Sequence, residues 1–342
     1  MRLHRLFRLF IFLLFPLFLS DFLSATAQET VRLPYFSTEI TQDRLERPSS
    51  TLFLGNLKKE PGDQWDWRLW VKPYGNWANR QTDSGVAGFQ SDIVGFMAGF
   101  DKKYSQRFQW GWSGGGSWIS IHSTKDTPKD MAKNEVGAFK TLLSGNLEYN
   151  EWRVKFGGGY GYSGQNHFRN NGFGTFDGNN DADQYGVQGE FQLKMGSRLF
   201  EIEPFLAGDY FQFSEKAFGE RLLSGSGNPL RYEKNRENSY STTLGVRYRW
   251  RQAGLFAVWH PELMAGWFHE YGSRQLARSS QQDPFPTLYT FQDSEIPREH
   301  ILFGAGFIGH MGNSMSVFAY YNADMAGSYS AHSILCGTYW NF

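Results

Sequence analysis

The feature that most constrains this chain is a long series of segments in which apolar and polar residues alternate. In one of them, Trp152, Val154 and Phe156 are separated by Arg153 and Lys155. A period of two predicts β-strands with one apolar face. About twelve such segments follow one another, at residues 67–79, 91–103, 107–121, 135–149, 152–164, 182–195, 199–213, 238–250, 254–270, 298–309, 314–325 and 330–342. The sequence therefore predicts an all-β fold.

The connections between these segments alternate in length. Short connections follow the even-numbered segments, for example at residues 104–107 and 150–151. Long polar connections follow most odd-numbered segments, at residues 80–90, 122–134, 165–181, 214–237 and 271–297. Tight turns at one rim and long loops at the other are typical of a transmembrane antiparallel β-barrel of the bacterial outer membrane. An even strand number places both ends of the barrel at the short-turn rim, which is the periplasmic side.

A secreted β-sandwich or jelly roll is the soluble alternative, because its strands also alternate. Strands in such folds are usually about five or six residues long, and the folds do not separate short from long connections. A lipid-embedded sheet must pair all its backbone polar groups, so it must close into a barrel. We therefore expect a barrel of about twelve strands with apolar side chains outside.

The first 27 residues have the pattern of a secretory signal peptide. Arg2, Arg5 and Arg8 precede an apolar run at residues 9–19. The small residues Ala25-Thr26-Ala27 then provide a cleavage site. The sequence therefore predicts Sec-dependent export and residence in the cell outer membrane.

Residues 28–64 differ from the rest of the chain, because they contain three prolines and no clean hydrophobic period. We interpret them as an N-terminal extension, for which a position in the lumen and disorder are both open. The barrel is expected at residues 65–342. After the signal peptide, no apolar run approaches the ~20 residues that a spanning helix needs.

Charge and cysteine content exclude two classes of function. Lys and Arg number 34, as do Asp and Glu, so the formal charge is zero. A neutral chain argues against a nucleic-acid partner. Cys336 is the single cysteine, which excludes an intramolecular disulfide and any multi-cysteine metal site.

Charged residues of two neighbouring segments share the face that would point into the lumen. Glu201 and Glu203 alternate with apolar residues, and Arg249 and Arg251 do the same in the following segment. Antiparallel pairing would bring these acids beside these arginines near the periplasmic rim. We predict a lumenal charge ladder, worth roughly 0.2–1 kcal/mol per pair, that fills the lumen and performs no chemistry.

Histidines and acids near the ninth segment are a candidate metal or acid–base site. His260 and Glu262 share a strand face, as do Glu262 and Glu270, but His269 faces the other side. The H-E-x-x-H spacing of zinc enzymes is absent. The Asp- and Asn-rich stretch 172–183 offers calcium ligands but lacks the EF-hand spacing. We expect lumen packing and an ordinary loop, with no metal.

A membrane-embedded hydrolase would need histidines and acids to converge from several loops. The candidates His122, His167 and Glu233 lie in different connections, and their sequence positions do not place them together. The chain also has no G-x-S-x-G nucleophile elbow. We therefore expect no enzymatic activity and no cofactor.

Several stretches resemble the C-terminal translocator domain of classical autotransporters, the type V secretion proteins. "WRLWVKPYGNW" resembles the opening W-x-x-x-Y-G strand of the family, and "PELMAGWFHEYG" resembles its Pro-led strand. "YYNADMAGSYSAHSILCGTYWNF" is similar to the family's last hairpin with its closing aromatic residue. The resemblance covers about residues 65–342.

The resemblance implies an integral outer-membrane barrel whose partners are outer-membrane lipid and the barrel-assembly machinery. It further implies that Trp340 and Phe342, at the end of the last strand, form the assembly signal that this machinery reads. Family members carry a large passenger ahead of the barrel, whereas residues 28–64 are too short for a stacked solenoid. We expect a translocator-type barrel lacking a large passenger, and a small-solute channel or a surface-binding barrel stays open.

Overall fold

The computed structural model describes residues 66–81, 88–123, 132–170, 172–197, 199–254, 257–271, 277–282, 288–292, 297–312 and 314–342. Within these ranges, all regular secondary structure is β-strand, and no helix there is long and apolar enough to cross a membrane. The signal peptide at residues 1–27 and the extension at 28–64 lie outside the described residues, so both stay predictions.

Twelve long strands make up one sheet. They are β1 (Trp67–Arg80), β2 (Phe89–Lys103), β3 (Phe108–Ser123), β4 (Ala132–Tyr149), β5 (Trp152–Asn170), β6 (Gly174–Leu193), β8 (Phe200–Glu215), β12 (Asn235–Trp250), β14 (Val258–Glu270), β17 (Glu299–Met311), β18 (Met315–Ala326) and β19 (Tyr329–Asn341). Each predicted segment coincides with one of these strands.

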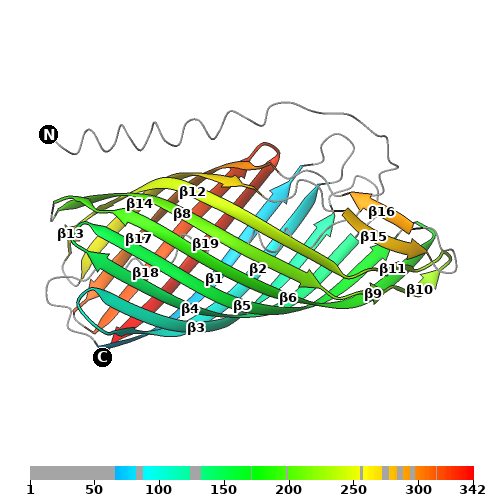
Figure 1. The fold of residues 1–342 in the computed structure, drawn as a ribbon, viewed down its shortest axis with the longest axis horizontal. Coiled ribbons are helices and arrows are strands. Elements are labelled where there is room, and N and C mark those ends of the chain that lie inside the picture. The colour runs from blue at the N-terminus through cyan, green and yellow to red at the C-terminus, as the bar shows by residue number, and fades with distance from the viewer. Residues whose placement is uncertain are drawn as a thin grey trace. The chain divides into compact units, whose positions relative to one another are not determined.

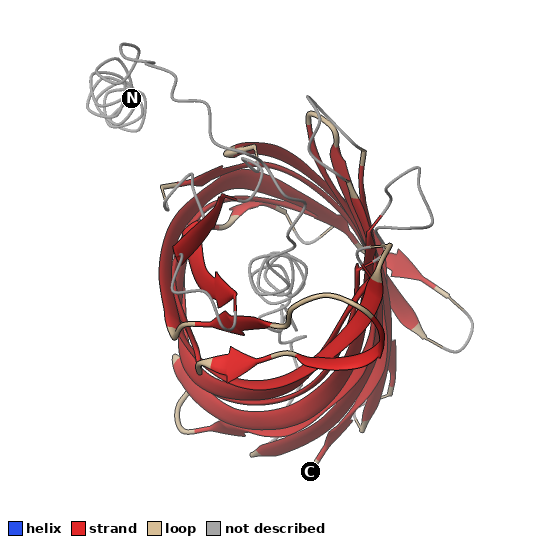
Figure 2. Ribbon diagram, turned by 90° about the vertical axis from the view of Figure 1, so that its right-hand side faces the viewer, coloured by secondary structure: helices blue, strands red, loops and turns tan. Residues whose placement is uncertain are grey.

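The sheet closes on itself. Each strand pairs antiparallel with the next, β6 pairs directly with β8, and β19 pairs with β1 from Arg68↔Asn341 to Arg80↔Tyr329. Figures 1 and 2 show the resulting barrel from the side and from one end. Closure leaves the wall without an unpaired edge, as a sheet in lipid requires. The prediction of a twelve-stranded antiparallel barrel is confirmed.

The two ends of the barrel differ. We call the end with the short connections 104–107 and 150–151, where Phe342 also lies, the turn end, and the opposite end the loop end. The short strands β7 (Met195–Gly196) and β13 (Gln252–Ala253) belong to hairpins of the turn end.

Additional short strands lie at the loop end (Figure 1). They are β9 (Phe218–Gly219), β10 (Arg221–Gly225), β11 (Leu230–Tyr232), β15 (Ala277–Gln282) and β16 (Leu288–Gln292). Four of them form a small sheet in the order β16-β15-β11-β9, while β10 pairs with β6. The connections predicted at 214–237 and 271–297 therefore contain regular structure of their own.

One predicted loop is wrong. The connection expected at 165–181 contains the last residues of β5, a bend at 172–173 and the first residues of β6. The two strands stay paired from Trp152↔Leu193 to Asn170↔Thr175. Their polar composition suggested a loop, but the antiparallel ladder satisfies the backbone whatever the side chains are.

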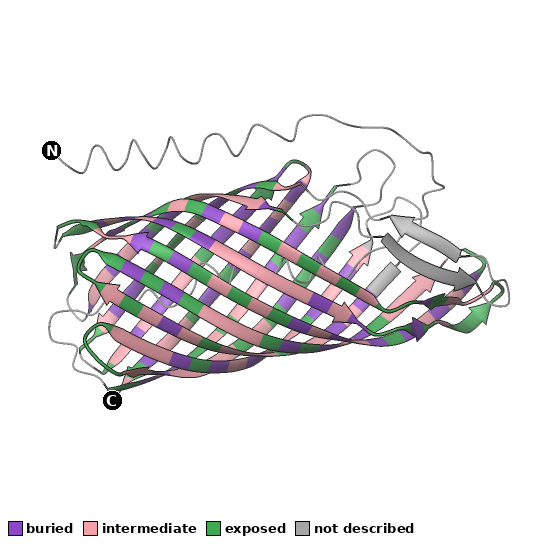
Figure 3. Cartoon of the chain, viewed as in Figure 1, coloured by how far each residue is buried: buried purple, intermediate pink, exposed green. Residues whose placement is uncertain are grey.

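Alternate residues of each strand face opposite sides of the wall, which gives the banded pattern of Figure 3. On the outer face, large apolar side chains such as Val94, Phe96 and Leu143 are exposed. On the inner face, Arg153 and Arg247 are buried. This is the distribution that a hydrocarbon exterior and a polar lumen require.

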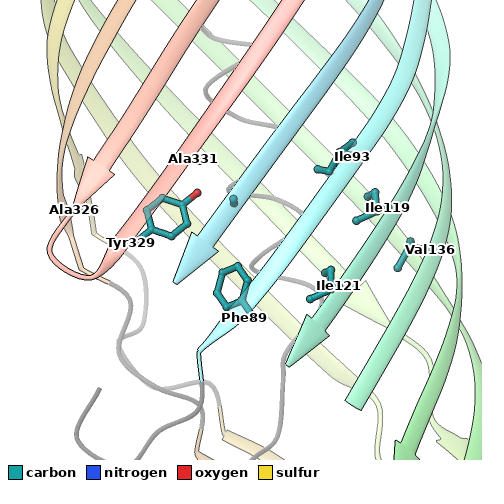
Figure 4. Packing of buried hydrophobic residues seen from close by; sticks show 9 residues of the cluster. Phe89, Ile93, Ile119, Ile121, Val136, Ala326, Tyr329 and Ala331 are labelled. Atoms are coloured by element: carbon teal, nitrogen blue, oxygen red, sulfur yellow. The ribbon is translucent and has the colours of Figure 1, made fainter. Parts of the chain in front are cut away.

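The inner wall is not uniformly charged. At the loop end a buried apolar cluster lines it (Figure 4). The cluster comprises Ala78, Phe89, Ile93, Ile119, Ile121, Val136, Ala326, Tyr329 and Ala331. Charged side chains instead concentrate near the turn end, where the candidate site lies.

Candidate functional site

The candidate site is a network of buried charges inside the barrel, near the turn end. Strand alternation places these side chains on the inner face of five neighbouring strands, from β5 to β14. Its members are Arg153, Lys155, Glu190, Glu201, Glu203, Arg247, Arg249 and Glu262.

The Arg247–Glu190 pair is the most enclosed contact of this network. Arg247 Nη1 donates to Glu190 Oε1 at 3.0 Å, and Nη2 donates to Oε2 at 2.7 Å. Each side chain is 1% exposed. Lys155 Nζ lies 3.4 Å from the same carboxylate, and the Arg247 guanidinium lies 3.9 Å from the centre of the Phe205 ring. The two hydrogen bonds to Glu190 and the contact with the Phe205 ring together fix the orientation of the Arg247 guanidinium plane.

Arg249 links three acids. Its Nε donates to Glu262 Oε2 at 2.9 Å, and its Nη2 contacts the same oxygen. Glu201 Oε2 lies 3.6 Å from Nη1, and Glu203 Oε2 lies 3.8 Å from Nη2. The structure thus brings together Glu201, Glu203 and Arg249 of the predicted ladder, and it adds Glu262 as the nearest partner.

Arg251, the fourth predicted member of the ladder, follows the end of β12 at Trp250. It is exposed, and its backbone N donates to Leu199 O at 2.8 Å. The place of Arg251 in the ladder therefore stays a prediction.

Several members of the network were not predicted from the sequence. Arg153 Nε donates to Glu148 Oε1 at 2.7 Å, Nη1 donates to Gln192 Oε1 at 3.2 Å, and Glu203 Oε1 lies 3.5 Å from Nη1. The sequence did contain a signal for Arg153, since this residue alternates with aromatic residues that face outward. Only the pairing of β8 with β12 was used for the prediction, whereas the network extends from β5 to β14 and contacts Glu148 of β4.

A second buried pair lies at the seam between first and last strands. Arg68 Nε donates to Asp101 Oδ2 at 2.9 Å, and Nη2 donates to it at 2.5 Å. The guanidinium lies 5.0 Å from the centre of the Tyr339 ring. This pair joins β1, β2 and β19, and it lines a hollow that Lys155 also borders.

The residues considered for metal or acid–base chemistry fall on different faces. His260, Glu262 and Glu270 are buried on the inner face. His269 lies on the outer face, with Nδ1 at 2.7 Å from Glu299 Oε1. Within the described ranges, no three His, Cys, Asp or Glu side chains are arranged to hold a metal ion.

The acids of stretch 172–183 bind neighbouring side chains. Arg221 donates to Asp177, Lys216 Nζ donates to Asp181 at 3.1 Å, and Tyr160 OH donates to Asp183 at 2.6 Å. The hydrogen bonds to these aspartates raise the pKa of Lys216 and of Arg221, both of which lie outside the spanning strands.

The histidines considered for a hydrolase are on opposite sides of the wall. His122 contacts Ser120 on the outer face of β3. His167 faces the lumen, where Nδ1 lies 2.9 Å from Asn134 Oδ1 and the ring stacks on Phe218. Glu233 is exposed after β11. The structure therefore does not bring these three residues together.

The last residue is tied to the first strand through its backbone. Phe342 N donates to Trp67 O at 2.8 Å, and Phe342 O accepts from Asp66 N at 3.0 Å and Trp67 N at 3.3 Å. The side chains of Trp340 and Phe342 are exposed. The main chain of Phe342 thus extends the β1–β19 seam, while its ring is available for recognition.

Comparison with protein families and curated proteins identifies one family. The family model "Autotransporter beta-domain" matches residues 69–322. Two extracellular serine proteases of Serratia marcescens are each 21% identical to this chain, over 281 and 331 residues. These matches cover 80% and 94% of this chain but 26% and 30% of the proteases. The chain thus spans less than a third of the length of these relatives.

Solved structures of similar fold include three autotransporter barrels. The translocator domain of NalP from Neisseria meningitidis aligns with a TM-score of 0.67 at 13% identity, over 89% of this chain and 95% of that one. The transport unit of AIDA-I from Escherichia coli gives 0.60 at 15% identity, over 88% and 99%. The β-domain of Bordetella BrkA gives 0.58 at 14% identity, over 81% and 100%. At these identities the similarity concerns the fold.

Proposed function

Because the chain belongs to the autotransporter β-domain family, we propose that its barrel, after Sec-dependent export, spans the outer membrane of the cell and conveys a polypeptide to the cell surface. The supporting observation is a closed twelve-stranded wall that is apolar outside and charged inside. The turn end faces the periplasm in this proposal, since short turns lie on that side in such barrels.

The same proposal specifies the partners of the barrel and the role of its lumenal ion pairs. Outer-membrane lipid contacts the exposed apolar band, and the barrel-assembly machinery reads Trp340 and Phe342. The lumenal ion pairs have a structural role and no catalytic one, because each acid of the network lies beside an arginine or lysine that neutralises it.

Membrane insertion is tested by extraction and gel migration. We expect the protein to resist carbonate washing and, after detergent extraction, to migrate faster unheated than boiled, because a closed barrel stays folded in dodecyl sulfate. Release by carbonate as a soluble species would reject an integral barrel.

Translocation is tested with a small epitope inserted after the predicted cleavage site at Ala27. External protease should remove the epitope from intact cells while leaving the barrel in the membrane. An epitope that stays protected while the barrel is correctly inserted would reject translocation. Steady ion conductance of the purified barrel in planar bilayers would then favour a small-solute channel.

A further inference from the structure

His300 has an unusual environment at the loop end of the lumen. Its Nδ1 lies 2.7 Å from Asp324 Oδ1, and its Nε2 lies 2.8 Å from the main-chain oxygen of Pro297. The His300 side chain is 2% exposed and that of Asp324 7%. Both ring nitrogens therefore face oxygen acceptors, in a buried contact with Asp324 and a partly buried contact with Pro297.

The Asp324 carboxylate oxygen and the Pro297 carbonyl oxygen each need a hydrogen in their contact with the His300 ring. The carbonyl of Pro297 can only accept, so Nε2 must carry a proton. A second proton must lie between Nδ1 and Asp324, on the ring or on the carboxyl group. The His300–Asp324 pair therefore holds two protons in this arrangement. Loss of either one leaves two lone pairs facing each other across a buried contact, which costs the full desolvation of an unpaired polar group.

The ring is held in place by its neighbours. The Phe268 ring meets it edge-on, with centroids 5.2 Å apart, and the Tyr329 ring does so at 5.6 Å. Rotation of the ring therefore cannot easily replace a lost hydrogen bond. Titratable and charged groups face this part of the lumen from the surrounding elements, namely Arg80 of β1, Glu270 of β14, Arg298 before β17, Asp324 of β18 and Tyr329 of β19.

Pro297 belongs to the connection between β14 and β17, which carries β15 and β16. Next to it, Arg298 O accepts from Glu270 N at 3.1 Å as the strand pairing begins. The bond from His300 is thus a side-chain anchor at the point where the connection joins the barrel wall.

We propose that His300 and Asp324 form a protonation-dependent latch that holds the end of the β14–β17 connection against the barrel wall. The latch is closed when the pair holds two protons and opens as rising pH removes one. Because the pair that has lost a proton leaves two acceptors facing each other, the connection is more tightly held in an acidic surrounding than in an alkaline one. This inference does not rest on the translocator function, because it concerns an anchor within the barrel.

Hydrogen exchange of the purified full chain in detergent micelles tests the latch. Exchange of the amides of residues 298–300 is measured at about pH 5.5, 7 and 8.5, which bracket the histidine titration, and corrected for the intrinsic pH dependence. We expect protection to fall about tenfold from the acidic to the alkaline condition, as for the loss of one charge-assisted hydrogen bond. A flat corrected profile of the unmodified protein would overturn the proposal.

Two variants assign the effect. His300→Gln offers an amide that does not titrate, so its protection at residues 298–300 should not change with pH. The matched control is His332→Gln, which removes a histidine whose Nδ1 lies 2.7 Å from Tyr321 OH on the outer face. This control should keep the pH dependence of the unmodified protein. Retention of the pH dependence in His300→Gln would overturn the latch, and its loss in His332→Gln would do the same.

Discussion

At the scale of single residues, strand register sets most partners of the lumenal arginines, and Arg247 is an exception. Arg247 lies directly opposite Glu203 in the β8–β12 register, yet its two-point bond goes to Glu190, two strands away. Arg249, in contrast, bonds to Glu262, which lies directly opposite it in the β12–β14 register. Neighbouring strands are about 4.8 Å apart, so a guanidinium can cross one strand and select the acid that gives the better geometry.

The Arg247–Glu190 pair should be costly to break. We expect Arg247→Met to lower the free energy of unfolding by about 3 kcal/mol, since it leaves the buried Glu190 carboxylate with Lys155 and the Gln192 amide as partners. Urea unfolding of the detergent-solubilised barrel measures this. The control is Arg221→Met, because Arg221 is 75% exposed in its pair with Asp177 and its loss should leave the unfolding midpoint unchanged. Equal midpoints for the two variants would show that burial of the Arg247 pair adds no stability.

Gly337 should tolerate no side chain. A Cβ atom there would lie 2.3 Å from Val71 O and 2.5 Å from the Phe318 ring, so Gly337→Ala must push β1 away from β19. We expect a lower unfolding temperature in detergent, read by loss of the fast-migrating form on unheated gels. Gly164→Ala is the control, since its Cβ would meet nothing within 4 Å. If both variants melt together, the seam adapts without cost.

At the scale of elements, the strands that contact lipid are the part of the fold that could be predicted from the sequence. All twelve strands could be predicted because lipid forces their outer positions to be apolar. The loop-end parts of β5 and β6 could not be predicted. Residues such as Asn166, Asn179 and Asp181 face outward there, beyond the apolar band, and their composition is typical of a loop. The same limit applies to the site. Alternation and antiparallel pairing predicted that Glu201 and Glu203 lie beside Arg249 of the neighbouring strand, but they could not show that Glu203 also lies 3.5 Å from Arg153, two strands away.

The connection between β8 and β12 is anchored by one carboxylate. Glu220 accepts from Arg169 of β5 at 2.8 Å and 2.5 Å, from Tyr232 OH at 3.1 Å and from Leu230 N at 2.9 Å. We expect Glu220→Gln to speed proteolytic cleavage within residues 216–234 by about tenfold, since the charge-assisted bonds are lost, while the barrel stays intact.

Limited proteolysis followed by mass spectrometry measures the Glu220 effect. Glu233→Gln is the matched control, because Glu233 is exposed in the same connection and should not alter the cleavage rate. Unchanged cleavage in Glu220→Gln would mean that the strand pairings of the connection and the ion pairs of Lys216 and Arg221 hold it without Glu220.

At the scale of the whole molecule, a barrel is one closed ring of strands, so the strength of its seam determines whether the whole wall persists. The β1–β19 seam carries the contact of the Arg68 guanidinium with the Tyr339 ring inside and the backbone bonds of Phe342 at its end. Inside the barrel, buried ion pairs near the turn end and an apolar lining at the loop end also connect the strands. The final residue therefore combines two separable contributions, a main chain that extends the seam and an exposed ring that does not pack against it.

These contributions predict different outcomes for two changes at Phe342. Phe342→Ala keeps the backbone bonds to Asp66 and Trp67 and removes a ring that is 69% exposed. The purified, refolded variant should therefore unfold like the unmodified protein, while the amount assembled in the outer membrane of cells falls several-fold, because the assembly machinery has lost its signal. Deletion of Phe342 should lower both quantities. Phe173→Ala, which removes a 78% exposed ring at the loop end, should change neither. Normal assembly of Phe342→Ala would assign the importance of the last residue to its backbone alone.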